Sequence, residues 1–415
     1  MTTTVDIPDT AEFEEEVRSW LSTILPVRPE PTPDDRPDLA VFRNLSDEDE
    51  ATLLENVRHY RRRRFDAGYG AVTLPIEHGG RGLPSSFASV IARVEQEFAV
   101  PASTELISVT TGLVGPAVAM FGSDEQRSTY AEALLRTDLL ACQLFSEPGA
   151  GSDLAALSCR GVRDGDGWVF DGQKVWSSGA RFADYGMLLA RTDPDVPKHK
   201  GITAFLIPLD APGVEIRPIR QMSGGASFNE VFLHAVRVPD SMRLGGVGEG
   251  WKVTGATLAF ERTASGSVTR KKGGSVVELV ALARSLGVLD DPVVRQEIAD
   301  VYIRSELRAA TADRVAEASA AGVSPGPAAS VGKLMASDVL GRIGEIAADL
   351  LGANITAEVD EDQFAWTEHL LGSPGYRLAG GTDQIQRNII GERVLGLPSE
   401  PRENRDQPWS GRDRR

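Results

Sequence analysis

Between residues 143 and 153 the chain reads Gln-Leu-Phe-Ser-Glu-Pro-Gly-Ala-Gly-Ser-Asp. Gly149 and Gly151 carry no side chain, so the backbone amides of this stretch can approach a bound molecule closely. Bulkier residues at these two positions would block such an approach. The stretch therefore predicts a loop that contacts a ligand, although Ser146 taken alone would indicate only a turn.

Two later stretches carry a similar signal. Residues 172–179 read Gly-Gln-Lys-Val-Trp-Ser-Ser-Gly, and residues 380–388 read Gly-Gly-Thr-Asp-Gln-Ile-Gln-Arg-Asn. In the first of these, Trp176 offers a broad apolar surface, and Ser178, two residues on, should point to the same side of a strand. Taken alone, Trp176 would indicate only a core aromatic residue.

The stretch at 380–388 predicts the start of a helix. Thr382 and Gln384 lie where apolar residues begin to recur at helical spacing. A helix N-terminus exposes free amides and favours anions, which suits a phosphate-bearing ligand. Plain N-capping by Thr382 is the simpler interpretation. A further glycine cluster at 245–250 follows no strand of a βαβ unit, so it predicts a turn before a helix at Trp251.

Hydrophobic spacing divides the chain into three domains and a tail. Residues 1–139 predict an N-terminal helical domain, because apolar side chains recur at helical spacing from Phe13 onward. Residues 140–241 predict a middle antiparallel sheet or barrel, because short apolar runs alternate with Asp-Gly, Gly-Gly and Pro-Gly turns. Residues 242–398 return to long helices. The tail, residues 399–415, is polar and is expected to be mobile.

Composition argues against several classes of function. The 415 residues carry a net charge of −16, which repels the phosphates of nucleic acids. With two cysteines and five scattered histidines, neither a disulfide framework nor a metal site is expected. The sequence has no long apolar run for a membrane helix and no visible secretory signal, and we expect a cytoplasmic protein. Four arginines at 61–64 predict a solvated or ion-paired helix face in preference to a phosphate-binding patch.

In their order and spacing, the three stretches resemble those of the FAD-dependent acyl-CoA dehydrogenase family, over residues 10–400. The resemblance implies a mainly α fold with a central β-domain: an N-terminal helical domain, a middle β-barrel and a C-terminal four-helix bundle. It also implies non-covalent FAD, with Trp176 packed at the flavin ring and Ser178 bonded near its N5 atom. The other flavin contacts that it implies are Gln143, Ser146, Thr382 and Gln384.

The resemblance implies substrate contacts as well. Ser152 matches a serine that touches the thioester arm, and the backbone amide of Gly380 matches a donor to the thioester carbonyl. Such donors acidify the α-carbon because they stabilise the negative charge that develops there. Gly381 and Arg262 are the other expected substrate-binding residues.

The catalytic base is where this sequence departs from the commonest family pattern. Most relatives have a glutamate immediately before the Gly-Thr of the last stretch, and this chain has Gly380 there. A minority, including isovaleryl- and long-chain-type enzymes, have it on the helix after the β-domain, within a Glu-Arg pair. The chain reads Ala-Phe-Glu-Arg at 259–262, so Glu261 is the predicted base. The alternative is that Glu261 forms an ion pair with Arg262 or with a neighbouring helix.

A second departure concerns the arginine that, in relatives, reaches the FAD of a neighbouring subunit. Its usual setting is Arg-x-x-Phe-Gly, and the nearest match here is Arg284-Ser-Leu-Gly287. Arg284 is therefore the expected contact to the FAD of a neighbouring subunit. Because the match is incomplete, it stays open whether another arginine makes this contact.

The function implied by the resemblance is acyl-CoA dehydrogenation, in which Glu261 removes the α-proton while flavin N5 accepts hydride from the β-carbon. The expected partners are acyl-CoA and an electron-transfer flavoprotein or similar acceptor, in a homotetramer or in a heteromer with a related subunit. Two alternatives stay open. One is an oxidase or monooxygenase whose reduced flavin meets oxygen, and the other is a non-catalytic subunit that holds FAD or acyl-CoA for a partner.

Overall fold

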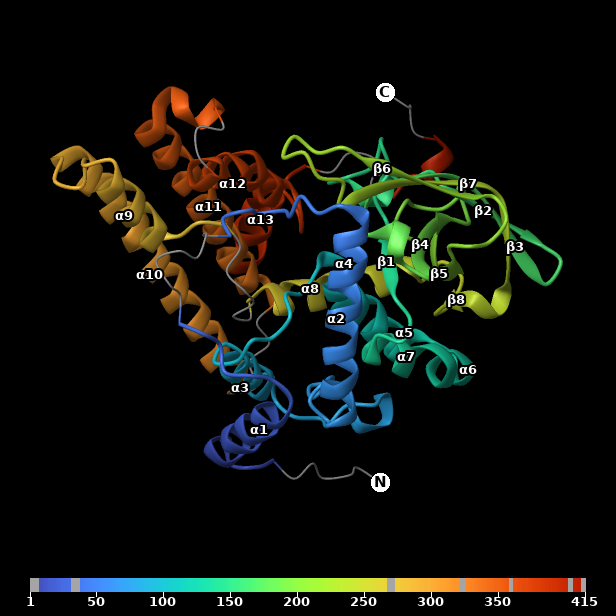
Figure 1. The fold of residues 1–415 in the computed structure, drawn as a ribbon. Coiled ribbons are helices and arrows are strands. Elements are labelled where there is room, and N and C mark those ends of the chain that lie inside the picture. The colour runs from blue at the N-terminus through green and yellow to red at the C-terminus, as the bar shows by residue number, and fades with distance from the viewer. Residues whose placement is uncertain are drawn as a thin grey trace.

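The computed structural model describes residues 7–30, 38–266, 273–320, 326–357, 361–401 and 406–411. Its elements follow one another in the predicted order, helical, β and helical. Figure 1 shows the blue to teal N-terminal helices below and in the middle, the green β-domain on the right and the orange C-terminal helices on the left. None of the described helices is apolar over a length that would cross a bilayer.

The N-terminal helices begin and pack as their sequence pattern predicts. At the start of the first helix, the side chain of Asp9 accepts a hydrogen bond from the amide of Ala11 at 2.9 Å. The buried residues Phe13, Val17 and Leu21 of this helix belong to a small core of their own. The N-terminal elements are α1 (Thr10–Ile24), α2 (Asp47–Asp66), α3 (Ser85–Glu95), α4 (Glu105–Val109), α5 (Gly115–Phe121), α6 (Asp124–Gln126) and α7 (Glu132–Arg136), with π-helical turns η2 (Thr110–Val114) and η3 (Arg127–Ala131).

Two of the four arginines in the run on α2 form ion pairs with acidic residues, which agrees with the predicted solvated or ion-paired face. Arg62 Nε lies 2.8 Å from Asp138 Oδ1, and Arg64 Nε lies 3.1 Å from Glu95 Oε1. The first pair ties α2 to the turn after α7, and the second ties it to the end of α3.

The β-domain is one mixed sheet. Its strands are β1 (Ala141–Leu144), β2 (Arg160–Asp164), β3 (Gly167–Ser178), β4 (Tyr185–Arg191), β5 (Ile202–Pro208), β6 (Val214–Ile219), β7 (Phe228–Pro239) and β8 (Arg243–Leu244). The strand order is β6-β7-β3-β2-β4-β5-β8, and β1 pairs with β4. β4 pairs in parallel with both β1 and β2, so the expected antiparallel arrangement is wrong for these two pairs, whereas the other strand pairs are antiparallel. No tight turn joins β1 to β4, and therefore none imposes an antiparallel direction.

The C-terminal helices surround a core of their own. This core contains Leu279, Ile343 and Trp366, and it also takes in Leu39 from the N-terminal part of the chain. The turn predicted at 245–250 is present, since the first of these helices begins at Gly250. The elements are α8 (Gly250–Gly266), α9 (Val276–Ser285), α10 (Pro292–Ala320), α11 (Ala329–Leu351), α12 (Glu361–Leu378), α13 (Asp383–Ile389) and π-helical η9 (Ile390–Val394).

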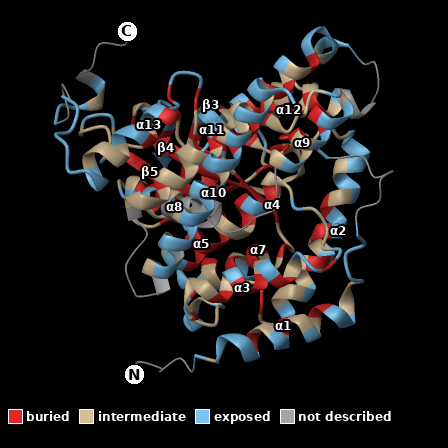
Figure 2. Ribbon diagram, turned by 90° about the vertical axis from the view of Figure 1, so that its left-hand side faces the viewer, coloured by how far each residue is buried: buried red, intermediate tan, exposed pale blue. Residues whose placement is uncertain are grey.

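A continuous core joins the β-domain to the helices on either side of it. Phe170 and Phe205 are buried there with ring centroids 4.8 Å apart. Leu106 and Ile107 of α4 and Val253 of α8 belong to the same cluster. Figure 2 shows buried parts of the ribbon, in red, between the β-strands and α4. The strand ends that carry the motifs are thereby fixed against both helical groups.

Part of the tail is bound to the β-domain, so the expectation of a mobile tail is wrong for residues 406–411. The amide of Trp409 donates to the carbonyl oxygen of Val196 at 3.0 Å. The Trp409 ring also lies 4.9 Å from the guanidinium carbon of Arg191. Composition does not reveal such docking, because it depends on backbone hydrogen bonds and a single aromatic ring.

Candidate functional site

The first two sequence stretches lie side by side in the structure. Ser146 follows β1, and its carbonyl oxygen accepts a hydrogen bond from the amide of Val175 on β3 at 2.9 Å. Val175 directly precedes Trp176. The glycine-rich loop and the strand that carries Trp176 therefore lie against each other, although they are distant in sequence.

A buried ion pair holds these two stretches together. Lys174 Nζ donates to Glu147 Oε1 at 2.8 Å and to the carbonyl oxygen of Phe145 at 3.1 Å, and the lysine is fully buried. Glu147 also accepts from the amides of Ser158 and Cys159, at 2.7 and 2.8 Å. Burial alone would raise the pKa of Glu147, but Lys174 and these donors bring it below its usual value. Glu147 therefore stays ionised and anchors the loop.

Sequence reasoning missed this ion pair, although a signal for it exists. The buried residues Trp168, Phe170 and Lys174 of β3 are separated by even numbers of positions, so they lie on the core-facing side of the strand. A lysine at a core-facing position needs a buried carboxylate as its partner. Glu147 in the neighbouring motif is that partner.

Trp176 sits at an irregularity of β3. The pairing of β3 with β7 shifts between Lys174 and Ser177, and the backbone of Trp176 has a φ of 62°, in the left-handed region. This conformation is strained for a bulky residue, and such strain clusters at functional sites. The Trp176 residue is 58% exposed, and its ring meets that of Phe228 edge-on at a centroid distance of 6.0 Å. Trp176 therefore presents an aromatic surface outward and is not a core residue.

The same irregularity changes the argument for Ser178. In a regular strand, residues 176 and 178 share a face, but the shift after Lys174 interrupts that alternation. Ser178 pairs with Phe228 of β7 and is half-buried, whereas Ser177 beside it is buried. Ser178 remains close to Trp176 along the strand, but the spacing of the two is not evidence for a shared face.

Two buried polar atoms in these stretches have no hydrogen-bond partner within the described chain. They are Gln143 Nε2 on β1 and Ser177 Oγ on β3. A buried polar group without a partner costs about 1–3 kcal/mol, so such atoms favour a bound polar molecule. At Gly149 and Gly151 an added Cβ would meet no atom within 4 Å, so the loop leaves open space beside it. These residues fit a flat aromatic ring with a polar edge, which is the chemistry of a flavin.

The third stretch forms the start of α13. Thr382 is the N-cap of this helix, and its side chain accepts from the amide of Ile385 at 3.2 Å. The simpler capping interpretation of Thr382 is therefore confirmed, and Gln384 nearby is exposed. Gly380 and Gly381 have φ values of 64° and 86°, in the region that favours glycine.

A buried carboxylate fixes α13 to two other helices. Asp383 accepts hydrogen bonds from Ser337 Oγ at 2.8 Å, Arg377 Nε at 2.9 Å and Lys333 Nζ at 3.3 Å. Burial would raise the pKa of Asp383, but these donors bring it below its ordinary value. The third stretch is thereby held against α11 and α12 by an ionised group.

An aromatic row connects the second stretch to the third. Phe42 stacks on Tyr376 of α12 at a centroid distance of 5.3 Å and meets Phe228 edge-on at 5.4 Å. Phe228 in turn contacts Trp176, and Tyr376 lies four residues before Gly380. The N-terminal segment that carries Phe42 therefore lies between the β-domain and the C-terminal stretch. Sequence reasoning missed Phe42, because an aromatic residue in an irregular connector gives no motif signal.

The structure gives fewer contacts for four other predicted residues. Glu261 and Arg262 lie on α8, and their side chains are outside the described residues. Ser152 is exposed on the glycine-rich loop. Arg284 is exposed near the end of α9, which Figure 1 shows on the opposite side of the molecule from β3. A single chain does not bring Arg284 to the other predicted flavin contacts.

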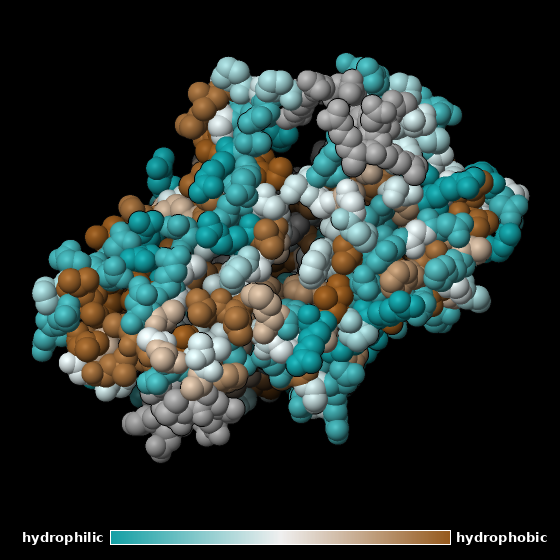
Figure 3. All heavy atoms as spheres, turned by 90° about the horizontal axis from the view of Figure 1, so that it is seen from above, coloured by the Kyte–Doolittle hydropathy of each residue, from teal (hydrophilic) through white to brown (hydrophobic). Residues whose placement is uncertain are grey.

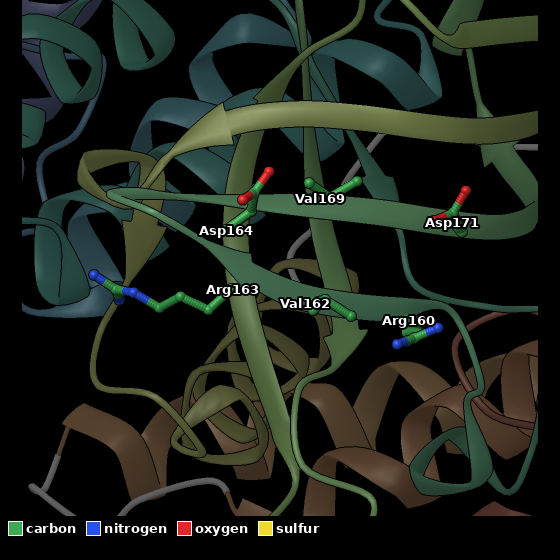
Figure 4. A pocket seen from close by; sticks show the side chains of 6 residues that line it. All are labelled: Arg160, Val162, Arg163, Asp164, Val169 and Asp171. Carbon is green, nitrogen blue, oxygen red and sulfur yellow. The ribbon is translucent and has the colours of Figure 1, made fainter.

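A shallow depression of about 320 Å³ lies outside this site, on the β2–β3 hairpin. Figure 4 shows Arg160, Val162 and Asp164 of β2 and Val169 and Asp171 of β3 around it. None of the predicted site residues lines it, so this depression is distinct from the candidate site.

Comparisons with known proteins decide the family. Models of the N-terminal, middle and C-terminal domains of acyl-CoA dehydrogenases match residues 45–138, 142–236 and 248–395. The acyl-CoA dehydrogenase IpdE1 of Mycobacterium tuberculosis is 35% identical over 399 residues, covering 94% of this chain and 99% of the relative. The chain belongs to the acyl-CoA dehydrogenase family. The predicted family, enzyme class and three-domain fold are thereby confirmed.

Solved acyl-CoA dehydrogenase structures share this fold. The structure titled "Tcur3481-Tcur3483 steroid ACAD" is 28% identical, has a TM-score of 0.74, and covers 96% of this chain and 100% of its own. The ChsE4-ChsE5 complex from Mycobacterium tuberculosis is 25% identical, has a TM-score of 0.70, and covers 96% of this chain and 100% of its own. Acyl-CoA dehydrogenases bind FAD, and the exposed Trp176 and the unpaired Gln143 Nε2 fit that group.

Proposed function

We propose that this chain catalyses the FAD-dependent α,β-dehydrogenation of an acyl-CoA thioester. The hydrogen bond from Val175 N–H to Ser146 O, 2.9 Å long, carries the proposal because it joins the glycine-rich loop to the strand of Trp176. FAD bound there would accept the hydride that leaves the β-carbon of the substrate. The chain itself supplies binding, orientation and proton transfer.

The proposed flavin contacts come from all three stretches. Trp176 would cover the ring, and Ser178 would donate a hydrogen bond near its N5 atom. Gln143 would bond to the polar edge of the ring, which is supported by its buried and unpaired Nε2 atom. The remaining proposed contacts are Ser146, Thr382, Gln384 and, from a neighbouring subunit, Arg284.

Glu261 is the proposed base that removes the α-proton. It lies on α8 four residues after Thr257, which is buried, so the two positions fall on one row of the helix. Gly380, where most relatives have the base, has a φ of 64°, which disfavours any side chain. The backbone amide of Gly380 would instead donate to the thioester carbonyl and so acidify the α-carbon. The other proposed substrate contacts are Ser152, Gly381 and Arg262.

Anaerobic flavin bleaching by acyl-CoA thioesters in a stopped-flow instrument tests this proposal. Glu261→Gln keeps the shape of the side chain and removes its basicity, so bleaching should slow by about two to four orders of magnitude. Glu132→Gln, at an exposed position on α7, is the matched control and should react like the parent. A Glu261→Gln rate within a few-fold of the parent would place the base elsewhere. A parent protein that takes up no FAD would overturn the proposed function.

We further infer that the acyl group derives from a steroid. The support is the solved relative whose title calls it a steroid ACAD, which is 28% identical over nearly the whole of both chains. Bleaching rates with a steroid-derived acyl-CoA and with straight-chain acyl-CoA thioesters of several lengths test the inference. Faster bleaching by the straight-chain thioesters would contradict it.

We also propose assembly with a related subunit, in preference to a homotetramer. Both solved relatives carry titles that name two proteins together. On this chain Tyr302, Ile303 and Leu307 of α10 are each more than half exposed. Exposed apolar side chains on one helix are expected where another subunit covers that helix. Figure 3 shows apolar side chains gathered at the left end of the upper face, over the C-terminal helices. Light scattering on the chain alone, and after co-expression with related subunits, distinguishes the two assemblies.

An electron-transfer flavoprotein or a similar carrier is the proposed electron acceptor. Two competing functions give different results when air is admitted after the anaerobic bleaching assay, or already in the bleaching itself. An oxidase or monooxygenase would be reoxidised rapidly by air without any carrier. A non-catalytic subunit would bind FAD or acyl-CoA, yet its flavin would not bleach with any thioester.

A further inference from the structure

The described end of the chain, residues 406–411, forms a strap on the connection between β4 and β5, residues 192–201. In Figure 1 the red C-terminal turn lies against the green β-domain. The contacts are the antiparallel pair Pro408 with Pro197, Trp409 N–H to Val196 O at 3.0 Å, Ser410 N–H to Pro194 O at 2.8 Å, and Ser410 Oγ to Asp195 Oδ1 at 2.9 Å.

The strap contacts a buried arginine that reaches the motif region. The Trp409 ring lies 4.9 Å from the guanidinium carbon of Arg191, which is only 3% exposed. Arg191 donates to the carbonyl oxygens of Ala155 at 2.6 Å and of Leu157 at 3.2 Å. These carbonyls belong to the segment that continues the glycine-rich loop, so Arg191 connects the strap to that segment.

A second connection reaches the loop itself. Lys198 Nζ lies 2.6 and 2.7 Å from the two carboxylate oxygens of Asp153, which directly follows Ser152. The carbonyl oxygen of Lys198 accepts from Arg191 Nη1 at 2.5 Å. The β4–β5 connection thus holds the end of the loop at which the substrate contact is expected.

We propose that Trp409 is a positioning residue for acyl-CoA binding. The strap fixes the β4–β5 connection, and this connection fixes the loop of Ser152 through Arg191 and Lys198. A cation over an aromatic ring is attracted more strongly where water is excluded, and the burial of Arg191 supplies that condition. The part played by Ser152 rests on the proposed function, whereas the connection between strap and loop does not.

Hydrogen–deuterium exchange of the FAD-loaded protein tests the connection without any need for activity. A chain that ends at residue 405 and the variant Trp409→Ala should both exchange faster in peptides covering 147–158 and 192–201. Trp409→Phe keeps an aromatic face over the guanidinium and should stay close to the parent. A chain that ends at residue 411 keeps every strap contact described and is the matched control. Faster exchange in 192–201 alone would overturn the proposal, because the strap would then cover only its own docking site.

Steady-state kinetics with the best thioester give the second result. We expect KM to rise about fivefold in Trp409→Ala with little change in kcat, because a positioning contact for bound substrate is lost. Parent-like kinetics in Trp409→Phe should accompany this rise. A loss of kcat at unchanged KM would contradict the proposal. If the parent itself shows no dehydrogenase activity, the proposed function fails, and the exchange experiment still decides whether the strap holds the loop.

Discussion

At the scale of single residues, the candidate site depends on two positions that break local rules. Trp176 has a left-handed backbone, and Lys174 carries a charge into the core of the β-domain. Both lie on the one strand that the sequence assigned to the flavin. The motif identified Trp176, but it did not reveal the backbone conformation, because φ there depends on the register shift against β7.

Substitutions at Trp176 should separate backbone strain from flavin binding. Trp176→Ala and Trp176→Gly both remove the indole, so both should bind FAD more weakly than the parent. Glycine tolerates a φ of 62°, so Trp176→Gly should have a free energy of unfolding about 1 kcal/mol above that of Trp176→Ala. Urea unfolding of the FAD-free proteins and fluorescence titration with FAD measure the two effects. Parent-like FAD affinity in both variants would contradict the role of the indole.

Substitution of Lys174 should expose the cost of a buried unpaired carboxylate. Lys174→Met leaves Glu147 ionised without its counter-charge, and we expect a loss of about 3–5 kcal/mol in the free energy of unfolding at neutral pH. The pair lowers the pKa of Glu147, so its stabilisation is present above the ordinary value of 4.5 and is lost as pH falls. Without Lys174, burial raises that pKa, and the loss should shrink toward pH 5.

Two comparisons check this prediction by urea unfolding. Lys252→Met removes an exposed lysine that lies 3.7 Å from Glu249, and it should cost less than about 1 kcal/mol. Glu147→Gln combined with Lys174→Met removes both charges, and it should be more stable than Lys174→Met alone. A penalty for Lys174→Met that does not change with pH would contradict the assignment of Glu147 as the ionised partner.

At the scale of elements, hydrophobic spacing located helices and strands but not their partners. The helix predicted at Trp251 begins at Gly250, yet the parallel direction of β1 is set by distant pairing and not by local pattern. Likewise, the motifs marked Ser146 and Trp176, but the contact between their two segments is a tertiary hydrogen bond. The polar composition of the tail predicted that it is mobile. In the folded chain, the backbone amide of Trp409 is instead hydrogen-bonded to Val196 of the β-domain.

Helix α12 carries a buried histidine that should make stability depend on pH. His369 Nδ1 accepts from the amide of Gly274 at 3.0 Å, so Nε2 carries the proton and donates to Leu340 O at 2.9 Å. Burial lowers the pKa of His369 below its ordinary value of 6.5. Below pH 6.5 the unfolded chain therefore binds a proton more readily than the folded chain, and the folded state loses stability. Above pH 6.5 this contribution is fully present.

Urea unfolding at pH 5 and pH 7.5 measures this effect. The parent should lose more stability between pH 7.5 and pH 5 than His369→Gln does. Glu368, the neighbouring residue, acts in the opposite direction, because burial raises its pKa and favours the protonated carboxyl. Glu368→Gln should therefore steepen the loss at low pH. If the free energy of unfolding depends equally on pH in the parent and in His369→Gln, His369 does not cause the pH dependence.

At the scale of the whole molecule, one N-terminal segment joins all three domains. Leu39 lies in the C-terminal core, Phe42 packs between β7 and α12, and Asn44 donates to Glu368 Oε1 at 2.9 Å. The strand of Trp176 and the Gly380 amide belong to different domains, so their relative geometry depends on this junction. We therefore expect the domains to unfold together.

Phe42→Ala should uncouple the C-terminal helices from the β-domain. Phe42 is buried, and its removal should leave a cavity that costs about 3–5 kcal/mol while breaking the row between Phe228 and Tyr376. Phe87→Ala is the matched control, because Phe87 is also buried but lies in the small core of α1 and α3. Calorimetry of the FAD-loaded proteins should resolve two transitions for Phe42→Ala and retain the parent's pattern for Phe87→Ala. Flavin fluorescence should report FAD release at the earlier of the two transitions, since the third stretch would then leave the strand of Trp176. If Phe42→Ala unfolds in a single transition and retains FAD like the parent, the aromatic row fills space without coupling the domains.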